Sequence, residues 1–137
     1  MILNGRQYNA TKGQVTKLNE TLKLSKKNKG KIDERVYKAM IAGINSQIDD
    51  LKSELNDYKK LQQVKTLNLS SLEDLPIIII KARVAKGYTQ QSFAEKLNLK
   101  PQQIQRYEAT NYKSVSFKRI VEILKALNID LKGKIPL

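Results

Sequence analysis

The chain has 137 residues, with 26 Lys or Arg against 13 Asp or Glu, and a formal net charge of +13. It has neither Cys nor His, which excludes disulfides and thiolate chemistry and removes the commonest metal ligand and general base. We therefore expect no enzyme activity, no cofactor and no metal, and the positive surplus favours a polyanionic partner such as nucleic acid. No apolar run approaches the roughly 20 residues that span a bilayer, so we also expect a cytoplasmic protein without a membrane partner.

The first 61 residues carry two amphipathic helical patterns. Apolar or weakly polar residues recur at steps of 3 and 4 over Gln7–Leu24, which predicts a helix with one apolar stripe. The segment Ser25–Lys31 has no apolar residue and predicts an exposed loop. A second helix is predicted to run to about Leu61, with Asp33 as its N-cap. Its stripe comprises Ile32, Val36, Met40, Ile44, Ile48, Leu51, Leu55 and Tyr58.

Two striped helices joined by a short loop bury their stripes by folding back on each other, so residues 1–61 are predicted to form an antiparallel helical hairpin. Its apolar residues lie only along the stripes, and the hairpin therefore needs a further partner. That partner could be the second domain, another copy of the chain or a different protein. Residues 62–74 show no sustained period and are interpreted as a linker, with a short extended piece at Val64–Leu69.

Residues 75–137 are dense with helix boundary signals. Pro76 suits the first turn of a helix, and Gly87 suits its end. Thr89 and Pro101 open two further helices, and Ser116 or Ser114 caps a last one that ends before Asn128. The predicted helices are Leu75–Lys86, Gln90–Leu97, Pro101–Ala109 and residues 117–127, the last with a face of Phe117, Ile120, Val121, Leu124 and Leu127. The fold class is therefore all-α: a hairpin followed by a compact domain of four to five helices.

Residues 90–108 have the pattern of a helix-turn-helix. Two helices that cross near a right angle need a small residue at the crossing, and Ala94 supplies it. The turn needs a residue that tolerates a left-handed backbone, and Asn98 is the best choice after Gly. Apolar residues stand at the inward offsets, at Phe93, Leu97, Leu99, Ile104 and Tyr107.

This stretch resembles the Cro/repressor, or XRE, family of helix-turn-helix regulators, over Leu75 to about Leu131. Further marks of the resemblance are the runs Lys86–Gln90 and Ile104–Glu108 and the loop at residues 111–116. The resemblance implies a structural ion pair between Arg83 and Glu108. Two departures are Asn98 in place of the usual turn glycine and Lys100–Pro101 in place of the usual Ser or Thr cap.

The second helix of such a motif enters the major groove of DNA. If Ile104, Tyr107 and Glu108 point inward, rotation of about 100° per residue turns the intervening polar residues outward. Gln can pair bidentately with adenine, and Arg with guanine. The predicted base contacts are Gln102, Gln103, Arg106 and Gln105. The predicted phosphate contacts, similar to the family's scheme, are Gln90, Lys100, Asn111, Tyr112 and Lys113.

The sequence thus predicts a sequence-specific transcriptional regulator, a repressor that binds double-stranded DNA as a homodimer. The hairpin or the segment Ile129–Leu137 would dimerise it. The alternative is an antitoxin whose hairpin binds a toxin protein and which also represses its own operon.

Overall fold

The computed structural model describes residues 1–137 and consists of helices and connecting segments without any strand, which confirms the all-α prediction. The chain divides into two compact units, Met1–Lys60 and Leu61–Leu137. None of its helices combines the length and the apolarity that a membrane crossing requires. The elements are α1 (Gly5–Ser25), η1 (Lys26–Asn28), α2 (Glu34–Leu61), η2 (Leu72–Asp74), α3 (Leu75–Ala85), α4 (Gln90–Lys96), α5 (Pro101–Ala109) and α6 (Phe117–Ala126).

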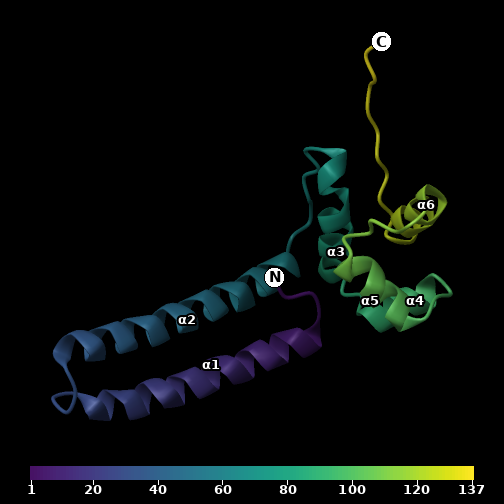
Figure 1. Ribbon diagram of the computed structural model, residues 1–137. Coiled ribbons are helices and arrows are strands. Elements are labelled where there is room, and N and C mark those ends of the chain that lie inside the picture. The colour runs from purple at the N-terminus through teal and green to yellow at the C-terminus, as the bar shows by residue number, and fades with distance from the viewer. The chain divides into compact units, whose positions relative to one another are not determined.

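The N-terminal unit is a hairpin in which α1 and α2 run antiparallel (Figure 1). Tyr8 near the start of α1 stacks on Tyr58 near the end of α2, with ring centroids 5.3 Å apart. Asn4 caps α1 by accepting a hydrogen bond from the backbone N–H of Gln7 at 2.9 Å. The predicted cap of α2 is also present, because the Asp33 carboxylate accepts the amides of the first turn at 2.9 and 3.2 Å.

The hairpin has almost no enclosed core. No residue of α1 is buried, and in α2 only Ile48 is. The predicted start of the second stripe is wrong: Ile32 and Val36 are 40% and 58% exposed. Because α2 begins at Glu34, Ile32 precedes the helix and Val36 lies in its first turn.

The C-terminal unit has a dense core built from all of its longer helices. Its fully enclosed residues include Ile79, Arg83, Phe93, Ile104, Ile123 and Leu127. One prediction for this core is wrong, since Phe117 is 83% exposed. It is the first residue of α6, and helical side chains lean toward the N-terminus, so its ring projects beyond the start of the helix. Ile123, which was not assigned to the face, is buried instead.

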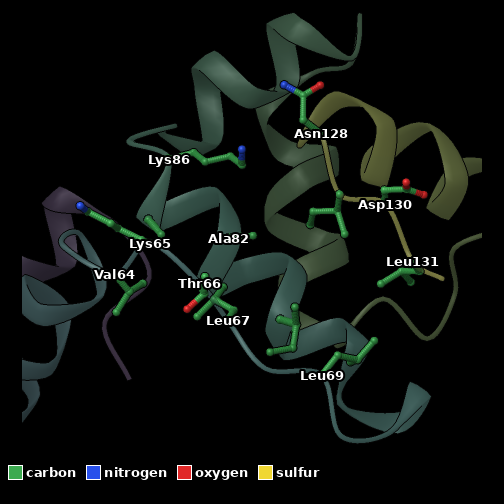
Figure 2. Close-up of a pocket in the computed structure, with 13 residues that line it drawn as sticks. Val64, Lys65, Thr66, Leu67, Leu69, Ala82, Lys86, Asn128, Asp130 and Leu131 are labelled. Atoms are coloured by element: carbon green, nitrogen blue, oxygen red, sulfur yellow. The ribbon is translucent and has the colours of Figure 1, made fainter. Parts of the chain in front are cut away.

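Residues 64–69, which precede α3 in the chain, form no strand and lie beside α3. Together with α3 and residues 128–131 they line a groove of about 360 Å³ (Figure 2). The groove is lined mainly by apolar side chains and by Lys65, Lys86 and Asp130. It has no group of acidic residues that could hold a metal ion.

Candidate nucleic-acid interface

The crossing of α4 and α5 is set by small residues and a left-handed turn. Ala94 is completely buried, and its carbonyl accepts the backbone N–H of Leu99 at 2.8 Å. Asn98 between them has φ 56°, so it takes the left-handed conformation that the sequence predicts for this position. The backbone therefore reverses within a few residues and brings the start of α5 against α4.

The start of α5 is capped by Gln103, a residue predicted from the sequence only to contact a base. The Gln103 side-chain carbonyl accepts the backbone N–H of Lys100 at 3.0 Å, and the Gln103 N–H donates to the Lys100 carbonyl at 2.9 Å. This is half of a capping box, in which a Gln three residues into the helix reaches back to the cap. The Lys-x-x-Gln spacing was the available signal, but the missing Ser or Thr at Lys100 obscured it.

A buried ionic network ties the helices of this unit together. Arg83 on α3 forms a bidentate pair with Glu108 on α5, with N···O distances of 2.5 and 3.0 Å. Both side chains are only 1% exposed. Arg83 also donates to the backbone carbonyl of Tyr88 at 2.7 Å, and the amide of Gln90 on α4 donates to Glu108 at 2.6 Å. The carboxylate thus fixes α3, α4 and α5 relative to one another.

The outer face of α5 is polar and carries no acidic residue. Ile104 and Glu108 are buried and Tyr107 is half-buried, so the remaining side chains of the helix turn outward. Four of the exposed residues are those predicted to contact bases, Gln102, Gln103, Gln105 and Arg106. The C-terminal unit therefore has both parts of the motif: a tight turn after α4, and a following helix, α5, with an exposed polar face.

Residues 79–133 match the family model for the helix-turn-helix. The C-terminal unit is a Cro/repressor-type helix-turn-helix domain. The protein is accordingly a DNA-binding regulator, and α5 is the second helix of its helix-turn-helix. No curated protein and no solved structure matches the chain.

The residues predicted to contact phosphates around this helix-turn-helix domain fall into two groups. Lys100, Asn111 and Lys113 are exposed at the two ends of α5. Gln90 is half-buried, and its side-chain amide is already bound to Glu108. A phosphate contact by the Gln90 side chain would therefore compete with the buried network.

Tyr112 does not fit its predicted contact with phosphate. It follows Asn111 in a left-handed turn, with φ 57°, and its side chain is only 5% exposed. The ring packs beside that of Tyr107, with centroids 6.0 Å apart, and the hydroxyl has no hydrogen-bond partner. Burial, and secondarily the negative charge of Glu108, raises the pKa of Tyr112 well above its ordinary value. The sequence did not indicate this burial, because a Tyr in a polar loop commonly faces solvent.

Proposed function

We propose that the protein is a sequence-specific transcriptional repressor whose recognition helix α5 reads bases in the major groove. The observation that supports this most directly is the polar, acid-free outer face of α5, opposite the buried Ile104 and Glu108. An acidic residue on that face would repel the phosphates at either side of the groove. Its absence leaves side chains that can donate to and accept from base edges.

Gln102 and Arg106 are the principal base readers in this proposal. Gln pairs bidentately with N6 and N7 of adenine, and Arg with O6 and N7 of guanine. Gln103 is a weaker candidate for bidentate pairing, because its side-chain carbonyl already accepts the amide of Lys100. Gln105 lies beside this pair on the exposed face and completes the set.

The repressor acts as a homodimer, because one small domain contacts few base pairs and operators with two-fold symmetry are read by paired domains. The hairpin is the element that we propose for dimerisation. It has no buried residue in α1, and a groove of about 500 Å³ opens between α1 and α2 beside Leu18 and Leu51. Apolar surface of this kind is covered when a second hairpin packs on it.

The same uncovered surface favours a second function, that of an antitoxin whose hairpin binds a toxin protein. Light scattering on the isolated full-length chain separates the two. A homodimer supports the repressor proposal. A chain that is monomeric alone and forms a complex only with a co-encoded protein supports the antitoxin.

The test of base reading begins with selection of a preferred duplex from a random library, followed by titration of the protein by fluorescence anisotropy. Gln102→Ala and Arg106→Ala should each weaken binding to the selected duplex by about 1–3 kcal/mol, or roughly 5- to 160-fold, with little change on a scrambled duplex. The matched controls Gln62→Ala and Arg35→Ala remove the same side chains from exposed positions outside residues 79–133, which match the helix-turn-helix family.

The control variants should bind like the unmodified protein. Equal binding of selected and scrambled duplexes, with a steep dependence on salt, would overturn the proposal of base reading. Repression is tested by transcription in vitro from a promoter that carries the selected site. The transcript should decrease as protein is added, and the Arg106→Ala variant should not decrease it.

A further inference from the structure

The charge of the hairpin is concentrated on one of its two helices. Residues 5–31, which form α1, η1 and the following turn, contain eight basic residues and one acidic residue. Residues 34–61, which form α2, contain five of each. The excess positive charge of the N-terminal unit therefore belongs to α1 and to the tip of the hairpin. We call this set the basic rim: Arg6, Lys12, Lys17, Lys23, Lys26, Lys27, Lys29 and Lys31.

The side chains of the basic rim are all exposed, and none of them forms a salt bridge. Neighbouring α2 has the carboxylates of Asp49, Asp50, Glu54 and Asp57, but none of them forms a salt bridge with the basic rim, and Glu54 pairs with the N-terminal amine at 3.7 Å instead. By contrast, Lys38 on α2 pairs with Glu34 one turn away at 3.2 Å. Like charges held together without counter-charges repel one another, and an anionic partner removes that repulsion.

We propose that the basic rim is a second DNA-binding surface, which contacts phosphates outside the site read by the recognition helix. The proposal rests on DNA binding by the helix-turn-helix domain and adds a backbone contact that carries no sequence information.

Duplex DNA fits the dimensions and the chemistry of this surface. A helix of 21 residues is about 31 Å long, and the duplex presents roughly one negative charge per 1.7 Å along its axis. Duplex DNA is also brought close to the hairpin, because the helix-turn-helix domain of the same chain binds DNA. Residues 62–71 tether the hairpin to it, which raises the effective concentration of phosphates around the basic rim. An acidic protein is the competing occupant.

The test is the salt dependence of binding to a long random-sequence duplex, with the full-length chain. Each phosphate neutralised by a Lys contributes about 0.9 to the slope of log K against log salt. The variant Lys26→Gln/Lys27→Gln/Lys29→Gln/Lys31→Gln should therefore reduce the slope by about 3 to 4. The matched control Lys38→Gln/Lys52→Gln/Lys59→Gln/Lys60→Gln removes the same charge from exposed positions of α2 and should leave the slope nearly unchanged.

A second variant, with Arg at all four tip positions, should restore the slope if phosphates are the ligand, because it retains the charge. Circular dichroism checks that the hairpin stays helical in each variant. If the slope of log K against log salt decreased equally in the tip and control variants, the effect would come from the net charge alone, and the proposal would be overturned. An unchanged slope in both would also overturn it, because the tip would then neutralise no phosphates.

The outcome is independent of the repressor proposal. Binding to random-sequence DNA reports phosphate contacts of the basic rim even if the protein does not discriminate between sequences. Gln102→Ala tests that discrimination without altering the basic rim.

Discussion

At the scale of single residues, the helix-turn-helix domain depends on a few side chains whose surroundings leave little choice of type. Arg83 and Glu108 neutralise each other in the core, where either charge alone would be strongly destabilising. Asn98 and Asn128 occupy left-handed positions, with φ 56° and 51°, at which most residues are strained. Tyr112 is the exception, since nothing in its buried surroundings satisfies its hydroxyl.

Arg83→Met should lower the free energy of unfolding of the helix-turn-helix domain by about 3–5 kcal/mol, because it leaves Glu108 buried without a partner cation. Urea denaturation followed by circular dichroism measures the change. Arg119→Met is the control in the same domain: its pair with Glu122 is about one-third exposed, so the loss should stay below about 1 kcal/mol. Similar losses in the two variants would show that the buried pair has no special role.

Tyr112→Phe should raise the free energy of unfolding by about 1 kcal/mol at neutral pH, because it removes a buried hydroxyl that has no partner. The gain should grow in alkali. Above the ordinary tyrosine pKa of 10.0 the unfolded chain releases the phenol proton, whereas the raised pKa keeps it bound in the folded state. This term lowers the stability of the unmodified protein by about 1.4 kcal/mol per pH unit between the two pKa values.

Urea titrations of both proteins at neutral pH and above pH 10.0 measure the Tyr112 term as a difference, in which the other tyrosines and the lysines cancel. A difference that does not change with pH would contradict the expected burial of this hydroxyl.

At the scale of elements, periodicity and caps in the sequence predict the helices well and their exposed ends poorly. The caps at Asp33, Thr89 and Ser116 are present, since each was indicated by a local pattern of side chain and backbone. A stripe of apolar residues does not reveal where a neighbouring helix stops covering it, which is why Val36 and Phe117 were placed on buried faces.

The candidate interface shows a related limit. The outward face of α5 follows from helical rotation, so its exposed residues were predictable from the sequence. The hydrogen bonds that occupy Gln90 and Gln103 were not, because each depends on the position of a second element or of a cap. Sequence patterns thus locate the exposed surface of α5, but they do not show which of its side chains are already held by hydrogen bonds within the protein.

The contrast within α6 gives a direct test. Ile123→Ala should lower the free energy of unfolding by about 2–5 kcal/mol, because it empties a fully buried site. Phe117→Ala should change it by less than about 0.5 kcal/mol, because the ring is 83% exposed. Urea denaturation measures which variant loses more free energy of unfolding. A larger loss for Phe117→Ala would mean that Phe117 lies on the buried face, as the sequence predicts.

At the scale of the whole molecule, the two units differ in how their stability arises. The helix-turn-helix domain encloses large side chains and an ion pair, whereas the hairpin has half-buried stripes and a single buried residue in α2. A helical pair with so little enclosed surface gains most of its stability from whatever covers the stripes. The proposed second copy of the chain therefore makes the stability of the hairpin depend on protein concentration.

That dependence can be measured on the full-length chain. A roughly hundredfold dilution should lower the apparent free energy of unfolding of the hairpin by about 2.7 kcal/mol, and the helix-turn-helix domain should be unaffected. Leu18→Lys places a charge on the half-buried stripe and should convert a dimer of 15.7 kDa chains into monomers, as measured by light scattering. Glu20→Lys adds a Lys on the exposed side of α1 and should leave the dimer intact. If hairpin melting did not vary with concentration and the unmodified chain had the mass of a monomer, a second copy of the chain would be excluded as the partner of the hairpin.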